Sequence, residues 1–265
     1  MTWIQVIVLA VVQGLTEFLP ISSSGHLVLV PSMLGWSDQG LVFDVAVHFG
    51  SLGAVCVYFR NDIAALLRGS LSVASGDTES PESRMAMAIA IGTVPAAVAG
   101  LSLASWISDN LRHPSVVVVT LAGFGIVLAL ADTFGKRQRV IADVRIRDAI
   151  AIGLAQALAL VPGTSRSGVT ISAALMLGFQ RRDAARFSFL LSAPVILLAT
   201  LYETAVLIMD GGSVAWSTLG AAALVSGVVA YLSIEFFMRF VTAIGLLPFA
   251  VYRLLLAAVI VVVLL

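Results

Sequence analysis

The chain has little charge for its length. Of its 265 residues, 11% are Asp, Glu, Lys or Arg and 60% are hydrophobic. A soluble domain carries about 25% charged residues, so the composition excludes an ordinary water-soluble protein and indicates an integral membrane protein. The 15 basic and 15 acidic residues balance, and such a neutral chain gives no reason to expect a nucleic-acid partner.

Cysteine and histidine are also scarce. The single cysteine, Cys56, excludes an intramolecular disulfide and a cysteine-based metal site. The whole chain has only three histidines, so a dedicated zinc site is not expected. Residues 1–12 lack a basic region, and no small-residue cleavage site precedes Gln13, so we do not predict a signal peptide.

Two polar, turn-forming tracts interrupt the apolar sequence, and they resemble each other. The first runs from Gln13 to His26 and the second from Gln156 to Thr170. Corresponding polar breaks in two hydrophobic halves are typical of an internally repeated membrane protein whose site lies between the repeats. When Gln13 is aligned with Gln156, identical residues recur at the positions of Gln13, Leu15, Ser22, Ser24, Gly25, Met33, Leu34 and Gly35.

Neither tract can cross a membrane as one helix. Each has two apolar arms that are too short to span, separated by Pro, Ser and Gly, which break a helix. We interpret residues 3–35 and 149–178 as re-entrant helix hairpins. The sequence therefore predicts an all-α polytopic membrane protein of one domain, residues 1–265. Six other stretches come near the roughly 20 apolar residues that a span needs: 43–59, 85–103, 115–134, 187–208, 216–236 and 245–265.

The basic residues predict the topology, because cytoplasmic loops collect Lys and Arg. The flanks of the first hairpin have none, which places them outside. Three spans separate the hairpins, so the second hairpin enters from the opposite face. We expect two inverted repeats, about 1–134 and 149–265, each a hairpin plus three spans, with both termini outside and the polar segment Ser70–Arg84 as a cytoplasmic loop. The flanks of the second hairpin carry Lys136, Arg137, Arg139, Arg145, Arg147, Arg181, Arg182 and Arg186.

The tips of the hairpins hold the candidate site. Ionisable groups within a membrane are costly and usually functional, which singles out Glu17, His26 and Arg166. Hairpins that enter from opposite faces bring their tips together near the midplane. A guanidinium, hydroxyls and helix N-termini suit a phosphate group. The surrounding hydroxyls belong to Ser22, Ser23, Ser24, Thr164, Ser165, Ser167 and Thr170.

A metal site is predicted beside these groups. Gln13 and Glu17 are four residues apart, so their side chains share one face of a helix. Oxygen ligands that are completed by substrate phosphates and water suit Mg²⁺ or Ca²⁺. His48 and His113 are expected to be structural residues, whereas Asp44 and Glu203 are candidates for the lining of the cavity.

The two tracts resemble the motifs of the bacterial undecaprenyl-diphosphate phosphatase family, known also for bacitracin resistance. Its first motif, with Glu followed by Pro-x-Ser-Ser-x-Gly-His, matches Glu17 and Pro20 to His26. Its second, Pro-Gly-x-Ser-Arg-Ser-Gly-x-Thr, matches Pro162 to Thr170. Gln13 stands where many members have Glu. The resemblance implies hydrolysis of a C55 polyprenyl diphosphate to the monophosphate carrier used in peptidoglycan synthesis, at a bacterial inner-membrane site that opens to the extracytoplasmic side.

On this hypothesis Arg166 clamps the diphosphate, with Ser165 and Thr170, and with Ser22, Ser24 and Ser167 as further phosphate contacts. Glu17 and Gln13 hold the divalent cation. Ser23 is the favoured nucleophile with His26 or Glu17 as its base, and a water activated by Glu17 is the alternative.

Other readings stay open. Inverted repeats with broken helices are also a transporter architecture, so a carrier or flippase for a prenyl phosphate lipid or an anion is the alternative function. The acid-phosphatase-like lipid phosphatases are disfavoured, because no histidine follows Arg166. The sequence leaves the choice between a monomer and a homodimer open.

Overall fold

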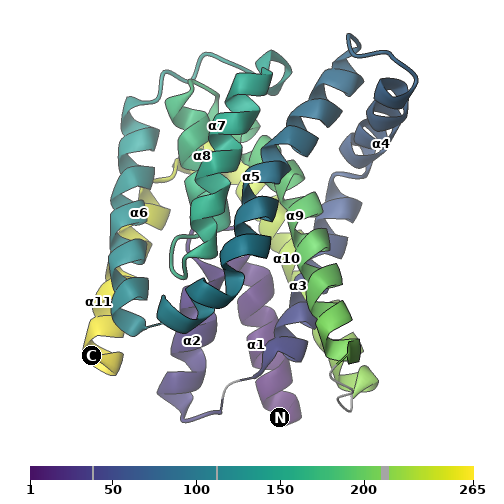
Figure 1. The fold of residues 1–265 in the computed structure, drawn as a ribbon. Helices are drawn as coiled ribbons and strands as arrows, with labels where there is room; N and C mark the ends of the chain where they lie inside the picture. Colours follow the sequence, from purple (N-terminus) through teal and green to yellow (C-terminus); the bar gives the residue numbers. More distant parts are fainter. Residues whose placement is uncertain (38, 112, 210–214) are drawn as a thin grey trace.

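Helices make up nearly all of the regular structure. The computed structural model describes residues 1–37, 39–111, 113–209 and 215–265. This part of the chain contains one isolated β-bridge, between Arg139 and Phe179, and no β-strand. The all-α prediction is therefore confirmed. The α-helices are α1 (Trp3–Thr16), α2 (Ser23–Leu34), α3 (Leu41–Tyr58), α4 (Arg60–Ala74), α5 (Pro81–Asn110), α6 (Pro114–Phe134), α7 (Ile146–Ala157), α8 (Arg166–Met176), α9 (Arg181–Met209), α10 (Trp216–Ile244) and α11 (Leu247–Leu264), with short 3₁₀ turns at Ile141–Asp143 and Leu158–Leu160 (Figure 1).

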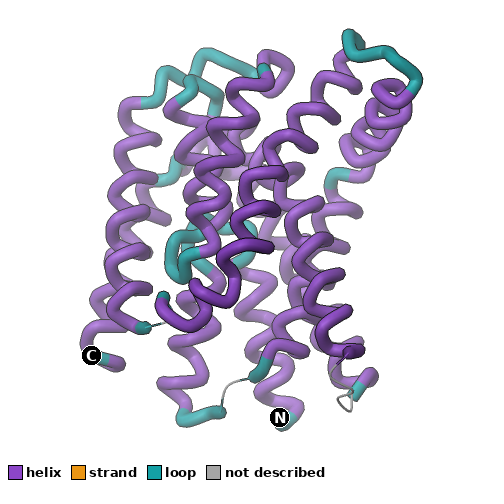
Figure 2. Tube along the Cα trace, viewed as in Figure 1, coloured by secondary structure: helices purple, strands orange, loops and turns teal. Residues whose placement is uncertain are grey.

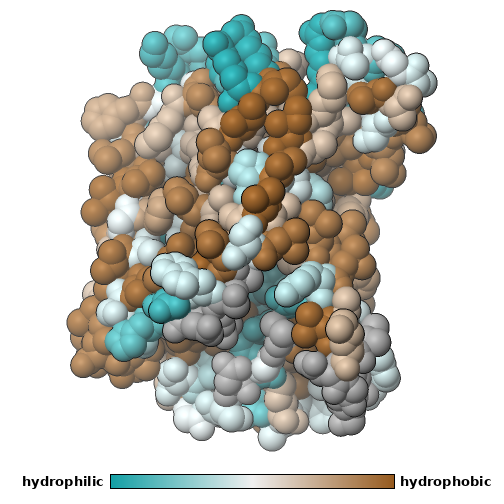
Figure 3. Space-filling view, in the orientation of Figure 1, coloured by the Kyte–Doolittle hydropathy of each residue, from teal (hydrophilic) through white to brown (hydrophobic). Residues whose placement is uncertain are grey.

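Several helices are long and apolar enough to cross a membrane. Within the described residues, five qualify individually: α5, α6, α9, α10 and α11. The pair α3 and α4 qualifies only as one broken unit, bent by 87°. Hydrophobic residues cover much of the middle of the molecule in Figure 3, and hydrophilic ones gather at the end that carries the α4–α5 and α6–α7 loops. This distribution is that of a multi-pass helical membrane protein.

The loop expected at Ser70–Arg84 is much shorter than predicted. Helix α4 continues to Ala74, and α5 begins at Pro81 with Ser80 as its N-cap. Proline is favoured in the first turn of a helix, where its missing N–H has no partner to lose. The prediction overlooked this start signal inside a polar segment.

Two pairs of short helices stop inside the bundle. Helix α1 ends at Thr16 and α2 starts at Ser23, whereas α7 ends at Ala157 and α8 starts at Arg166. Figure 2 shows loop segments at mid-height of the bundle, well away from the loops at its ends. We call residues 17–22 the first turn and residues 158–165 the second turn.

Close backbone contacts position the first arm of each pair. A Cβ atom on Gly14 of α1 would lie 2.6 Å from the carbonyl oxygen of Ser226 in α10. A Cβ on Gly153 of α7 would lie 2.4 Å from the carbonyl oxygen of Gly92 in α5. Only glycine permits such approaches, so each arm rests directly on the backbone of a long helix.

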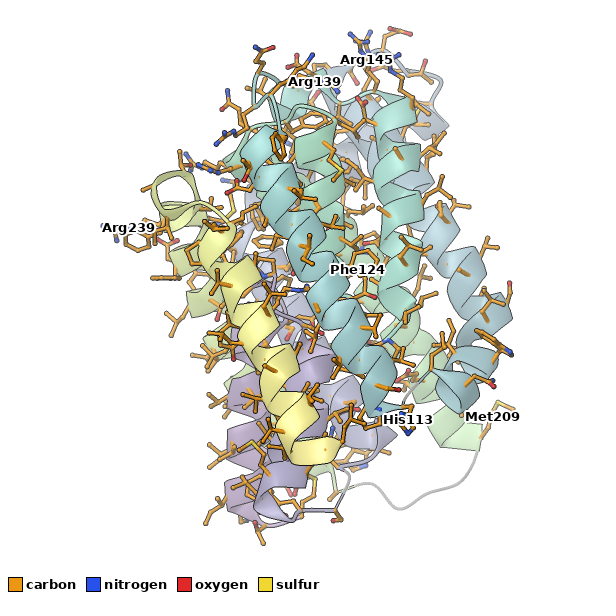
Figure 4. All side chains as sticks on the ribbon, turned by 90° about the vertical axis from the view of Figure 1, so that its left-hand side faces the viewer. His113, Phe124, Arg139, Arg145, Met209 and Arg239 are labelled. Carbon is orange, nitrogen blue, oxygen red and sulfur yellow. The ribbon has the colours of Figure 1, made fainter. Side chains whose placement is uncertain are left out.

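The two ends of the molecule differ in charge. Arg139 and Arg145 lie at one end, and His113 and Met209 lie toward the other (Figure 4). Both termini lie at the end opposite the α4–α5 and α6–α7 loops (Figure 1). At the arginine-rich end, Asp132 accepts two hydrogen bonds from Arg181, at 2.6 and 3.0 Å, and Arg139 pairs with Asp148.

Candidate functional site

The two turns have the same unusual local backbone. Ser22 precedes α2 with φ +73°, and Ser165 precedes α8 with φ +67°. Residues other than glycine rarely adopt positive φ, and such strain gathers at functional sites. Each serine hydroxyl accepts a hydrogen bond from a glycine N–H three residues on, Gly25 at 3.4 Å and Gly168 at 3.2 Å. The sequence similarity of the two tracts therefore corresponds to a shared helix-start geometry.

Each turn is hydrogen-bonded to the start of the helix that follows the other turn. The backbone N–H of Gly163 donates to the hydroxyl of Ser24 at 3.2 Å, and the hydroxyl of Ser167 donates to the carbonyl of Leu19 at 3.0 Å. The side chain of Phe18 is fully buried and meets Phe189 of α9 edge to face, with ring centroids 5.3 Å apart. Packing and hydrogen bonds thus hold the two tips together, as the sequence analysis expected.

Glu17 is the centre of the site. Its Oε1 accepts a hydrogen bond from Arg166 Nη2 at 2.8 Å. Its Oε2 accepts from the hydroxyl of Ser23 at 2.9 Å and from the amide of Gln13 at 2.8 Å. The side chains of Glu17 and Arg166 are 6% and 12% exposed, so each charge compensates the other in a mostly buried environment.

His48 of α3 is a site residue that the sequence analysis missed. Its Nδ1 lies 2.7 Å from the carbonyl oxygen of Asp44 and must donate to it, since a carbonyl only accepts. Its Nε2 then points to the carboxylate of Glu17, at 3.6 Å from Oε2. The residue was assigned a structural role because nothing in the local sequence of α3 indicates that it faces the hairpin tip.

A cavity of about 580 Å³ opens beside this cluster. Its polar lining includes the predicted residues Glu17, Ser22, Ser23, Ser24, Ser165 and Arg166, and it also includes Asp44 and Glu203, as proposed from the sequence. Apolar side chains complete the wall: Leu27, Val28, Val117, Leu160, Val195 and Ile196. The cavity therefore combines a charged floor with a surface that suits a hydrocarbon chain.

Five predicted residues lie near the cavity without lining it: Gln13, His26, Thr164, Ser167 and Thr170. The hydroxyl of Thr170 donates to the carbonyl of Arg166 at 2.7 Å and lies 2.6 Å from the hydroxyl of Ser188 in α9. In this arrangement Thr170 supports the backbone that carries Arg166. The hydroxyl of Ser167 already donates a hydrogen bond to the carbonyl of Leu19 in the first turn.

His26 is held on both sides of its ring. Its Nδ1 lies 2.7 Å from the carbonyl oxygen of Ser22, and its Nε2 lies 2.6 Å from the hydroxyl of Tyr252 in α11. The carbonyl requires a proton on Nδ1, so Nε2 of the neutral ring accepts from the tyrosine hydroxyl. Both nitrogens are thereby engaged away from Ser23, and Glu17 is the base within hydrogen-bond distance of that hydroxyl.

Arg253 of α11 holds the second turn from behind. It is completely buried. Its Nη2 donates to the carbonyls of Gly163 at 3.0 Å and Thr164 at 2.9 Å, and its Nε donates to the carbonyl of Leu121 at 3.2 Å. A buried cation that binds carbonyl oxygens fixes the backbone beside Arg166. In the sequence, Arg253 is a single charged residue in an apolar segment, and nothing nearby indicates its contacts.

The donor set fits a hard cation only if substrate and water complete its coordination. Within the described residues, no group of three or more His, Cys, Asp and Glu side chains is placed to hold a metal. The Oε1 of Gln13 is, however, buried without a hydrogen-bond partner in that part of the chain. One carboxylate and one unpaired amide oxygen match Mg²⁺, which retains waters and substrate phosphates.

These features define a class of protein: a multi-pass helical membrane protein whose internal cavity joins an arginine–carboxylate–serine cluster to apolar walls. The chain belongs to the family of the bacitracin resistance protein BacA, whose model matches residues 6–259. Similar proteins include an undecaprenyl-diphosphatase of Hahella chejuensis, 53% identical over 97% of both chains. Those of Chromohalobacter salexigens and Nitrosococcus oceani are each 51% identical, over 99% and 97% of both chains.

Proposed function

We propose that this protein hydrolyses undecaprenyl diphosphate to undecaprenyl phosphate and inorganic phosphate. The observation that carries the proposal is the cluster of Arg166, Glu17 and Ser23 on the floor of a cavity with apolar walls. The name of the similar proteins, undecaprenyl-diphosphatase, agrees with this chemistry. The product is the lipid carrier of peptidoglycan synthesis, and its regeneration accounts for bacitracin resistance.

Phosphate binding rests on charge and on helix ends. The Nη2 of Arg166 already donates a hydrogen bond to Glu17. Its Nη1 is buried and has no hydrogen-bond partner among the described residues. A bound phosphate oxygen can accept from this nitrogen. Helices α2 and α8 begin at the same place, at Ser23 and Arg166, and their N-termini add partial positive charge.

Ser23 is the proposed nucleophile. Its hydroxyl proton passes to Glu17 Oε2 while Oγ attacks the terminal phosphorus, and the bond from that phosphorus to the bridging oxygen breaks. The lipid monophosphate leaves with the bonding electrons and takes the proton from Glu17, which becomes a carboxylate again. Water then attacks the phosphoserine and gives a proton to Glu17, which passes it to Ser23 Oγ as the bond between phosphorus and Oγ breaks and inorganic phosphate is released. Direct attack by a water that Glu17 activates needs the same residues without the covalent intermediate.

A divalent cation, Mg²⁺ or Ca²⁺, is proposed at Glu17 and Gln13. When bound, it supplies positive charge that offsets the charge on the leaving phosphate. Gln13 reaches this position because it lies one helical turn before Glu17, on the same face of α1.

The membrane arrangement is proposed as two inverted repeats, each a re-entrant hairpin followed by three spans, in the bacterial inner membrane. The similar helix starts at Ser22 and Ser165 and the placement of both termini opposite the α6–α7 loop support it. The cavity then opens to the extracytoplasmic side. Labelling of single cysteines, placed at Thr2 or Arg145 in a chain with Cys56→Ala, from outside intact cells tests the orientation, and only Thr2→Cys is expected to react.

Phosphate release from farnesyl diphosphate and a C55 diphosphate by the purified protein tests the activity. Wild type and the exposed control Arg239→Ala are expected to release phosphate, and Arg166→Ala to lose at least about 10³-fold in kcat/KM, as when a main charge-stabilising group is removed. A folded wild type that releases nothing under any divalent metal favours a prenyl phosphate or anion transporter.

A further inference from the structure

Gln156 presents to the cavity an amide that has no hydrogen-bond partner in the part of the chain that the structure describes. It lies in the last full turn of α7, is 2% exposed and lines the cavity that holds Glu17 and Arg166. Among the described residues, neither its Nε2 nor its Oε1 has a hydrogen-bond partner. Buried side-chain amides are nearly always hydrogen-bonded, so an exception beside a cavity requires an explanation.

A comparison with Gln13 shows which hydrogen-bond partner Gln156 lacks. The two glutamines occupy equivalent places in the two tracts. The amide of Gln13 donates to Glu17, four residues on, at 2.8 Å. The residue four positions after Gln156 is Leu160. The second tract therefore retains the amide but lacks the carboxylate that would satisfy it, which leaves its hydrogen bonds for a group that enters the cavity.

The position of Gln156 favours the phosphate that remains on the lipid. The terminal phosphate of the substrate must lie over the hydroxyl of Ser23, beside Arg166. The second phosphate leads to the hydrocarbon chain, and residues that follow Gln156 in the chain, Ala159 and Leu160, are apolar parts of the same wall. Gln156 thus lines the same cavity as Glu17 and Arg166 and lies within one helical turn, along the chain, of apolar residues that suit the prenyl chain.

We propose that Gln156 binds the lipid-linked phosphate of a prenyl diphosphate, donating from Nε2 to a non-bridging oxygen. This inference rests on the proposed function and assigns the second half of the diphosphate site. A neutral donor stabilises the charge that develops on this phosphate as the bridging bond breaks. Because it adds no positive charge, it also lets the monophosphate product leave.

The test uses Gln156→Met, which keeps the length of the side chain and removes its polar atoms, with Gln180→Met as the control at an exposed position. The kcat/KM for farnesyl diphosphate is expected to fall about tenfold, the effect of one hydrogen bond to a charged oxygen. The melting temperature of the free protein is expected to stay or rise, because an unsatisfied amide is removed from a buried site.

Binding distinguishes the two phosphate positions without any turnover. Methylene diphosphonate, in which CH₂ replaces the bridging oxygen, is expected to bind Gln156→Met about tenfold more weakly than wild type, while the Kd of inorganic phosphate changes less than twofold. Equal weakening of both ligands, unchanged kcat/KM, or a melting temperature several degrees lower with activity retained overturns the inference. If wild type binds diphosphonate through Gln156 but hydrolyses no diphosphate, the proposed function fails and the subsite stands.

Discussion

Glu17 and Arg166 form an ion pair between the two broken-helix tracts, with 2.8 Å from Nη2 to Oε1. The residues lie 149 positions apart in the chain. Because both are mostly buried, the pair links the two tracts and places a carboxylate and a guanidinium on one cavity.

Removal of one member of this pair should destabilise the protein as well as inactivate it. Arg166→Ala leaves the carboxylate of Glu17 buried without its cation, which costs about 3–5 kcal/mol. The double variant Arg166→Ala with Glu17→Gln should regain most of that stability but no activity. Thermal unfolding in detergent measures the first effect and phosphate release the second. A double variant no more stable than Arg166→Ala contradicts the coupling.

Ser23→Ala separates the two nucleophiles. If Ser23 attacks, kcat falls by about 10³-fold or more, because the covalent route is lost. Acid quenching of wild type during turnover, followed by mass spectrometry, should then show phosphate on Ser23. Ser32→Ala, at an exposed position of the same helix, is the matched control. A rate of Ser23→Ala near that of wild type identifies an activated water instead.

His26 is expected to position the first turn without transferring a proton. His26→Asn can retain the hydrogen bond to the carbonyl of Ser22 and should keep kcat/KM within about tenfold of wild type, with an unchanged pH profile. Tyr252→Phe should behave similarly, since it removes one hydrogen bond. A loss of about 10³-fold in His26→Asn, or a shifted acidic limb of the profile, assigns the proton transfer to His26.

Metal removal should abolish most of the activity. EDTA is expected to suppress phosphate release, and Mg²⁺ or Ca²⁺ to restore it. Gln13→Glu adds a second carboxylate to the proposed site and should lower the metal concentration for half-maximal activity by about tenfold, equivalent to ~1.4 kcal/mol of binding. Gln180→Glu, at an exposed position, controls for added charge. Full activity in EDTA rejects the metal proposal.

Arg253 should act on stability and activity together. Arg253→Met leaves the carbonyls of Leu121, Gly163 and Thr164 without their donor, at a cost of roughly 2–5 kcal/mol. The second turn loses its support, so kcat/KM should fall while the identity of the preferred substrate is unchanged. Differential scanning fluorimetry beside the activity assay measures both. Wild-type stability in this variant contradicts the role assigned to Arg253.

The sequence predicted the class of fold and the centre of the site for local reasons. Pro, Ser and Gly in an apolar stretch cannot continue a helix, so the breaks before α2 and α8 were expected. Glu17 and Arg166 were identified because charge inside a membrane needs a partner. The loop at Ser70–Arg84 was overestimated, since the N-cap at Ser80 was read as part of a polar linker.

By itself the sequence determined that this is an all-helical membrane protein with polar and charged residues at two helix breaks, because composition and helix breaking are properties of short segments. Only the tertiary structure decided which distant side chains complete that site. His48 of α3 and Tyr252 and Arg253 of α11 reach the two hairpin tips, and Gln156 lines the cavity without a hydrogen-bond partner among the described residues. The physical reason is that such contacts depend on how helices rotate and cross, which the local residue pattern leaves open.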